Sequence, residues 1–102
     1  LAMNYQSLRQ DELERVSSLF KILGHPKRLQ LLYLLMQNRM TVSEISQALD
    51  WEQSAVSHQL QLLKQKKLVT ASRRGKNMVY QLTSPQIMAL IADAIEDRNL
   101  GR

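Results

Sequence analysis

The side chains best suited to chemistry in this sequence lie between positions 53 and 66. They combine hydroxyl, amide and imidazole groups, which donate or accept hydrogen bonds, with lysines, which supply positive charge. Such groups suit the base edges and phosphate oxygens of nucleic acid. Val56, Leu60 and Leu63 recur at helical spacing, so a helix is predicted here. Its polar residues fall mainly on other faces: Ser54, Ser57, His58, Gln61 and Lys64.

Positive charge is concentrated in the same part of the chain. The formal net charge is +5, yet no aspartate or glutamate lies between positions 53 and 92. The cations of that segment are Lys64, Lys66, Lys67, Arg73, Arg74 and Lys76. This segregation indicates a face that binds a polyanion. An ordinary solvated helix on a basic surface is the alternative, but solubility does not require so long a segment to lack acids.

Composition argues against several other classes of protein. There is no cysteine, which excludes a disulfide framework, a thiolate nucleophile and a cysteine-ligated metal. With two histidines on separate predicted helices and no phosphate-binding glycine loop, we expect no enzyme. No apolar run reaches the roughly 18 to 20 residues of a membrane span, so a cytoplasmic protein is expected. Leu1, Ala2 and Met3 are given no role.

A second short helix is predicted directly before the polar one. Thr41 and Glu44 have the spacing with which a helix caps its own free N–H groups, so this helix should start at Thr41. Its apolar stripe consists of Val42, Ile45 and Leu49. A tight turn at Asp50 and Trp51 then leads into the polar helix, predicted over about residues 53–66. This arrangement is typical of a helix-turn-helix whose second helix is the recognition helix.

Residues 68–82 are predicted to form a β-hairpin. The segments 68–72 and 78–82 are short, and they are rich in β-forming or alternating residues. Between them, Gly75 and Asn77 are expected to adopt the positive φ values of a hairpin turn. The cations at the tip are Arg73, Arg74 and Lys76. A basic hairpin directly after a recognition helix is the wing of a winged helix, within reach of phosphates or the minor groove, although a charged loop is often merely solvated.

Two amphipathic helices are predicted near the ends of the chain, over about residues 7–23 and 84–98. Gly24 should end the first by adopting a left-handed conformation, and Ser84 with Pro85 should open the last. The apolar stripe of the last helix is Ile87, Leu90, Ile91, Ala94 and Ile95. So apolar a helix needs cover, and we expect the equivalent helix of a second subunit, joined by the first helix. Packing onto its own domain is the alternative.

The remaining helix is predicted over residues 27–37 and is expected to be the buried centre of the domain, because leucines surround most of its circumference. Pro26 suits its first turn, and Asn38 is expected to end it. His25 precedes the proline. We interpret this histidine as a local structural residue rather than as a metal ligand or a pH sensor.

Three segments together resemble a known family: LFKILGHPKRLQLLYLL, VSEISQALDWEQSAVSHQLQLLKQKKLV and the basic hairpin ending in VYQL. They are similar to the ArsR/SmtB family of bacterial winged-helix repressors. The resemblance implies a mostly α fold with a small β-hairpin, in the order α-α-α-α-β-β-α, and the length suits a single domain over residues 1–102. It further implies a homodimer that binds an imperfect palindrome in double-stranded DNA and releases it when a ligand binds. The positions that match the family's DNA-contacting residues are Val42, Gln53, Ser54, Ser57, His58, Arg73, Arg74 and Lys76.

The sequence departs from the family at the positions that bind an inducer. Members that sense soft metals carry a cysteine motif where this chain reads LQLLYLLM. Members that sense metals across the dimer use Asp and His at the positions that are here Ser84, Gln86, Asp97 and Leu100. No metal or other cofactor is therefore predicted. A further departure is Glu52, which stands where the family often has serine and would repel a nearby phosphate.

The favoured hypothesis is a dimeric repressor in which Ser54, Ser57, His58 and Gln61 read bases. The residues expected to hold phosphates are Lys64, Arg73, Arg74 and Lys76. Two alternatives stay open. One is a metal-sensing repressor with an atypical site, to which the carboxylates near the end of the last helix, Asp93, Glu96 and Asp97, could contribute. The other is a winged-helix protein-interaction module, which the acid-free segment argues against.

Overall fold

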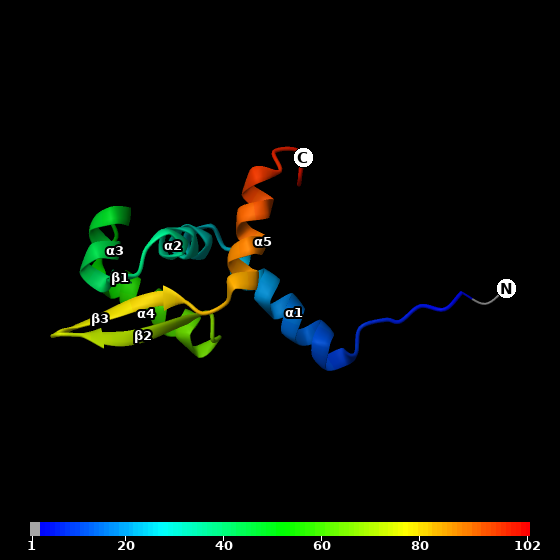
Figure 1. The fold of residues 1–102 in the computed structure, drawn as a ribbon, viewed down its shortest axis with the longest axis horizontal. Helices are drawn as coiled ribbons and strands as arrows, with labels where there is room; N and C mark the ends of the chain where they lie inside the picture. The colour runs from blue at the N-terminus through cyan, green and yellow to red at the C-terminus, as the bar shows by residue number, and fades with distance from the viewer. Residues whose placement is uncertain (1–2) are drawn as a thin grey trace.

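The computed structural model describes residues 3–102; Leu1 and Ala2 lie outside the described residues. Over these residues five helices and three short strands follow one another, with the basic hairpin at one end of the folded part, the two terminal helices at the other, and the segment before α1 extending beyond them (Figure 1). The elements are α1 (Gln10–Leu23), α2 (Pro26–Gln37), β1 (Met40–Thr41), α3 (Val42–Leu49), α4 (Gln53–Gln65), β2 (Val69–Arg74), β3 (Asn77–Leu82) and α5 (Pro85–Glu96). The predicted mostly α, winged helix-turn-helix fold is confirmed.

The sheet contains one strand more than the sequence predicted. Its order is β1-β3-β2, and both pairings are antiparallel. Strand β1 pairs Met40 with Tyr80 and Thr41 with Val79. A two-residue strand is too short to show alternation in the sequence, and Thr41 also serves as the N-cap of α3, which is the only role the sequence pattern revealed.

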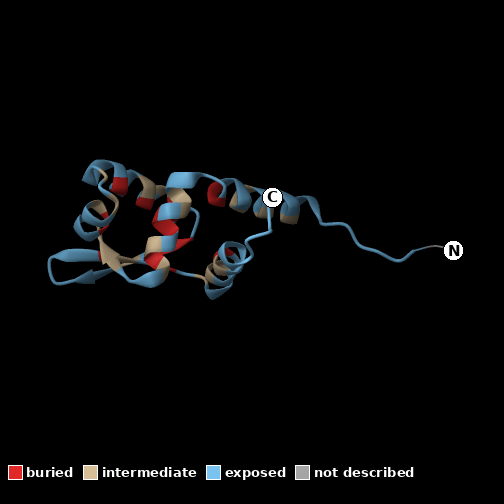
Figure 2. Ribbon diagram, turned by 90° about the horizontal axis from the view of Figure 1, so that it is seen from above, coloured by how far each residue is buried: buried red, intermediate tan, exposed pale blue. Residues whose placement is uncertain are grey.

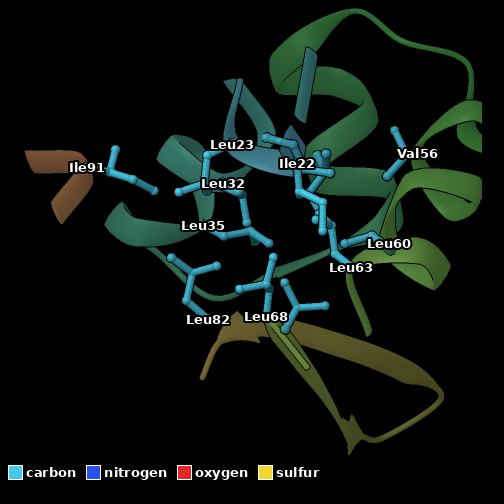
Figure 3. Packing of buried hydrophobic residues seen from close by; sticks show 13 residues of the cluster. Ile22, Leu23, Leu32, Leu35, Val56, Leu60, Leu63, Leu68, Leu82 and Ile91 are labelled. Atoms are coloured by element: carbon cyan, nitrogen blue, oxygen red, sulfur yellow. The ribbon is translucent and has the colours of Figure 1, made fainter. Parts of the chain in front are cut away.

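The hydrophobic core lies between α2, α4 and the sheet. Leu31 and Leu32 of α2 are completely buried and pack in one cluster with Leu60 and Leu63 of α4 (Figure 3). Leu82 of β3 closes the cluster from the side of the sheet. Helix α2 is therefore the centre of the domain as predicted, although one of its sides, at Tyr33, remains exposed.

The end of α1 differs from the prediction. Gly24 does not adopt a left-handed conformation: its φ is −78° and its N–H donates to the Phe20 carbonyl at 2.8 Å, as in a continuing helix. The chain leaves the helix one residue later, at His25, whose backbone is extended. A residue before proline is pushed out of the helical region by the proline ring. Pro26, at the first position of α2, is thus the feature that ends α1.

The other helix boundaries follow local hydrogen bonds. Helix α1 begins at Gln10 rather than near residue 7, because the Arg9 N–H donates to Glu12 at 3.0 Å and makes Arg9 the N-cap. Helix α5 ends at Glu96 rather than at residue 98. The predicted cap of α5 is confirmed, since the Ser84 hydroxyl accepts from the Ile87 N–H at 3.3 Å. No helix of the described part of the chain is long and apolar enough to cross a membrane.

The terminal helices bury only part of their apolar surface (Figure 2). On α5, Ile91 is buried and Ile87 is half-buried against the core, so this side packs onto its own domain. The neighbouring side is open, with Leu90 38% and Ile95 50% exposed. On α1, Phe20 is 53% exposed. The α1 and α5 side chains together line an apolar groove of about 450 Å³.

Candidate nucleic-acid interface

The turn between α3 and α4 is short and held by hydrogen bonds. Asp50 adopts a left-handed conformation, with φ of 56°. The Trp51 N–H then donates to the Ser46 carbonyl at 3.1 Å, and the Ser46 hydroxyl donates to the Trp51 carbonyl. Because both bonds return to α3, the turn fixes the direction in which α4 leaves.

The start of α3 is a reciprocal capping box. The Thr41 hydroxyl accepts from the Glu44 N–H at 3.1 Å, and the Glu44 carboxylate accepts from the Thr41 N–H at 2.9 Å. The backbone N–H of Thr41 is the main reason why the pKa of Glu44 lies below its usual range. Val42, a predicted DNA contact, is the first helical residue and is half-buried. The cap therefore orients the end of α3 that faces the wing.

Helix α4 has one buried face and one open face. Val56, Leu60 and Leu63 are at most 1% exposed and anchor the helix to the core. All six predicted DNA-contacting residues of this helix are exposed: Gln53, Ser54, Ser57, His58, Gln61 and Lys64. Within residues 3–102, only Gln53 among them makes a side-chain hydrogen bond, to the Ser43 hydroxyl at 3.3 Å. The polar face therefore leaves most of its donors and acceptors free for a ligand.

The end of α4 is a Schellman motif built on a lysine. Lys67 has φ of 62°, an uncommon conformation for a residue other than glycine. This conformation allows the Leu68 N–H to donate to the Leu63 carbonyl at 2.9 Å, while the Lys67 N–H donates to the Lys64 carbonyl. Leu68 is buried beside it, and the Thr83 hydroxyl donates to the Lys67 carbonyl at 2.8 Å. These contacts fix the wing relative to α4.

The tip of the wing is a two-residue turn. Arg74 pairs with Asn77, so Gly75 and Lys76 form the loop, and Gly75 has φ of 62°. The predicted positive φ is confirmed for Gly75 but wrong for Asn77, which already belongs to β3. Arg73, Arg74 and Lys76 are all exposed, as expected for cations that approach a polyanion. Successive strand residues point to opposite faces, so Arg73 and Arg74 do not share one.

Two cations of this surface were not predicted from the sequence. Arg39, directly before β1, lines a hollow of about 260 Å³ with Arg73 and Arg74. Lys27 of α2 places its ammonium group 5.7 Å from the centre of the Trp51 ring, beside the start of α4. Recognising β1 in the sequence would have brought Arg39 next to the wing. No comparable sequence signal pointed to Lys27, because its approach to the turn is a tertiary contact.

The cations of the interface have no acidic partners within 4.0 Å. Among the described residues, the recorded ion pairs join Arg9 to Asp11 and Arg9 to Glu12, both at the start of α1. Helix α2 is tied to α4 by a hydrogen bond instead, from the Arg28 guanidinium to the Gln59 side chain at 3.2 Å. Glu52 is the N-cap of α4 but makes no capping bond with its side chain. The surface around α4 is thus positive and largely uncompensated.

The polar side chains that the sequence comparison aligned with metal-binding positions make local hydrogen bonds. Asp97, one of the carboxylates considered for an atypical metal site, accepts from the N–H groups of Asn99 and Leu100 at 3.1 and 3.2 Å. The Ser84 hydroxyl donates to the Gln86 side chain at 3.1 Å. Across residues 3–102, no group of three or more His, Asp or Glu residues is arranged to hold a metal ion. His25 caps α2 without a side-chain hydrogen bond.

The structure combines a recognition helix that has a free polar face, a short fixed turn before it and a cationic wing after it. These three features define a winged helix-turn-helix DNA-binding domain. The model of the bacterial regulatory protein, arsR family, matches residues 25–71. The chain is 32% identical over 90 residues to the transcriptional repressor SmtB homolog of Synechocystis sp., covering 85% of this chain and 68% of that protein. It is 33% identical over 89 residues to the transcriptional activator HlyU of Vibrio cholerae, covering 87% and 82%.

A solved structure shares both the fold and the sequence pattern. It is the homodimeric winged helix-turn-helix DNA-binding domain of a possible ArsR-family transcriptional regulator from Mycobacterium bovis. The TM-score is 0.77 at 33% identity, with 91% of this chain and 87% of that chain covered. The chain belongs to the ArsR family, and it is a DNA-binding transcriptional regulator.

Proposed function

We propose that the protein is a homodimeric repressor that binds a specific site in double-stranded DNA and leaves it when a small ligand binds. The observation that carries this proposal is the outer face of α4. Ser54, Ser57 and His58 are exposed, and their side chains make no hydrogen bond within the described part of the chain. Buried leucines hold the helix from behind, so this face is free to enter a major groove.

The proposal divides the interface into two sets of residues with different tasks. Ser54, Ser57, His58 and Gln61 read base edges, because their short or planar polar groups donate and accept at defined positions. Val42, the first residue of α3, and Gln53, the first residue of α4, contact the DNA beside this set. The second set holds phosphates by charge: Lys64, Arg73, Arg74 and Lys76. The first set determines specificity and the second determines affinity.

A homodimer is proposed because the open groove of α1 and α5 is apolar. Its lining includes Phe20 and Leu23 from α1 and Leu90 and Ile95 from α5. A second copy would remove the exposed side chains among them, Phe20, Leu90 and Ile95, from water, each with a favourable transfer free energy on the order of 1 kcal/mol. Two recognition helices related by a twofold axis would then reach successive major grooves about 34 to 36 Å apart. The Mycobacterium bovis relative is itself a homodimer.

The test separates specificity from affinity with two variants. The operator is first selected from a pool of random duplexes, and binding to it and to an unselected duplex is measured over a range of salt. His58→Ala should lose discrimination between the two duplexes by roughly thirtyfold or more, because the dimer loses one base contact of about 1 to 3 kcal/mol in each half-site. Arg74→Ala should weaken both complexes alike and make the slope of log K against log salt shallower by about 1.8, which is about 0.9 for each subunit of the dimer.

Arg98→Ala is the matched control, because it removes the same charge beyond α5, at the end of the molecule away from the wing (Figure 1). It should bind both duplexes as the wild type does. The proposal is wrong if the wild-type protein ignores duplex DNA even at low salt. The division of tasks is wrong if His58→Ala and Arg74→Ala lose affinity equally on both duplexes.

A further inference from the structure

We propose that Arg39 completes a phosphate-binding notch with Arg73 and Arg74, and that this notch clamps the DNA backbone at the base of the wing. The inference rests on the proposed function, because it names a further contact in the same complex. The three arginines line one hollow of about 260 Å³, together with Ser72 and Val79. Arg39 lies more than thirty positions away from the wing arginines in the sequence.

The three-stranded sheet brings these residues together. Thr41 of β1 pairs with Val79 of β3, and Val79 pairs on its other side with Ser72 of β2. Directly paired residues share a face of the sheet, and residues two apart on a strand share it as well. Arg74 therefore lies on the same face as Ser72. Arg39 stands two residues before Thr41 and reaches this face from the opposite edge of the sheet.

The notch is positive and has no ion-pair partner. Arg39 and Arg74 approach the hollow on one face of the sheet, Arg73 borders it from the neighbouring position, and their like charges repel one another. The described residues place no carboxylate within 4.0 Å of any of the three. Glu44 senses Arg74, which is the smallest of the causes that act on the pKa of Glu44. That carboxylate is already used to accept the Thr41 N–H at 2.9 Å. An incoming phosphate would relieve the repulsion that the free protein retains.

Arginine suits this task better than lysine. Its planar fork of N–H donors matches two oxygens of one phosphate, and its charge persists at all physiological pH values. Because Arg39 belongs to the link between α2 and β1, it is part of the body of the domain rather than of the hairpin. A phosphate held by Arg39 and Arg74 together would couple the position of the wing to that of the helix-turn-helix. The contact carries no sequence information of its own.

The experiment is a salt titration of the full chain, with Arg39→Gln compared with the wild type on the selected operator and on an unselected duplex. A homodimer loses one phosphate contact in each of its two subunits, so the slope of log K against log salt should become shallower by about 1.8 on both duplexes. When salt rises from 50 to 200 mM, the fold loss of affinity should therefore be about 12 times smaller for Arg39→Gln than for the wild type. Arg39→Lys should retain the wild-type slope with weaker binding, because it keeps the charge and loses the fork.

Three comparisons distinguish the possible failures. Arg98→Gln removes an equal charge far from the notch and should leave the slope unchanged. If Arg39 and Arg74 hold the same phosphate, Arg39→Gln with Arg74→Gln should lose less affinity than the sum of the single changes. A wild-type slope in Arg39→Gln overturns the notch while leaving the proposed function intact. A wild-type protein without salt-dependent duplex binding overturns both.

Discussion

Apolar side chains are arranged differently in two parts of the molecule. These parts are the DNA-facing half of the chain, residues 39–82, and the terminal pair of helices, α1 and α5. In the DNA-facing half, the inward stripe of α4 is buried and the outward face is polar. In the terminal pair, Phe20, Leu90 and Ile95 are exposed along one groove. The DNA-facing half therefore completes its core within one chain. The terminal pair presents apolar surface that only another molecule would cover.

The same contrast holds for polar groups. Within the DNA-facing half, hydrogen bonds hold the start of α3, the turn after it and the end of α4, so the recognition surface is preorganised before DNA binds. The charges on that surface are left unpaired instead. Preorganised donors lose less entropy on binding than flexible ones. The DNA-facing half thus exposes positive charge, which suits DNA. The terminal pair exposes apolar surface, which suits a second copy of the chain.

The largest expected effect comes from the core of the DNA-facing half. Leu63→Ala should lower the free energy of unfolding by about 2 to 5 kcal/mol, because a completely buried leucine leaves a cavity between α4 and α2. Urea denaturation followed by circular dichroism measures the change. Met78→Ala, on the exposed side of the wing, should cost less than about 1 kcal/mol. Equal costs for the two variants would show that the core is not where the burial pattern locates it.

An intermediate effect is expected in the terminal pair. Phe20→Ala should weaken self-association by about 1 to 3 kcal/mol, since Phe20 lines the apolar groove and is a large aromatic side chain. Sedimentation equilibrium measures the dissociation constant, which should rise by roughly 5- to 150-fold. Met78→Ala serves again as the control and should dimerise as the wild type does. A dissociation constant unchanged by Phe20→Ala would remove this groove from the interface.

Much of the DNA-facing half could be predicted from the sequence because its signals are local. The 3.6-residue periodicity of α4 separates Val56, Leu60 and Leu63 from the polar residues, and the structure exposes every α4 residue that was predicted to contact DNA. Whether those residues contact DNA stays a prediction. Thr41 with Glu44, and Ser84 with its first-turn proline, likewise marked helix starts through hydrogen bonds that span only three residues.

The features that escaped prediction depend on contacts between distant segments. Strand β1 exists because β3 offers it an edge, and Arg39 reaches the wing only through that pairing. Two misassigned conformations have a related cause: Gly24 was expected to be left-handed and Asn77 to have a positive φ, on residue type alone. Among the described residues, positive φ values occur at Asp50, Lys67, Gly75 and Gly101, and of these the sequence predicted that of Gly75. At Lys67, the buried Leu68 and the bond to Leu63 make this conformation favourable.

The smallest expected effect on stability comes from a helix start. The caps of α3, in the DNA-facing half, and of α1, in the terminal pair, differ in one hydrogen bond. Both α1 and α3 have a glutamate that accepts the N–H of the N-cap residue, Glu12 from Arg9 at 3.0 Å and Glu44 from Thr41 at 2.9 Å. Only at α3 does the N-cap side chain return a bond, because the Thr41 hydroxyl oxygen accepts from the N–H of Glu44. Thr41→Ala should therefore lower the free energy of unfolding by about 1 kcal/mol.

Glu44 gives this cap a dependence on pH. Its pKa in the folded chain is lowered below the ordinary value of 4.5, chiefly by the Thr41 N–H, so the carboxylate stabilises the fold above pH 4.5. That contribution is lost as the pH falls through the lowered pKa of the folded state. Glu44→Gln keeps the acceptor but removes the charge, so its urea midpoint should decline less on acidification than that of the wild type. Thr41→Ala leaves the backbone donor in place, so its urea midpoint should still decline with falling pH almost as much as that of the wild type. If the urea midpoints of the wild type and Glu44→Gln declined in parallel, Glu44 would be excluded as the source of the pH dependence.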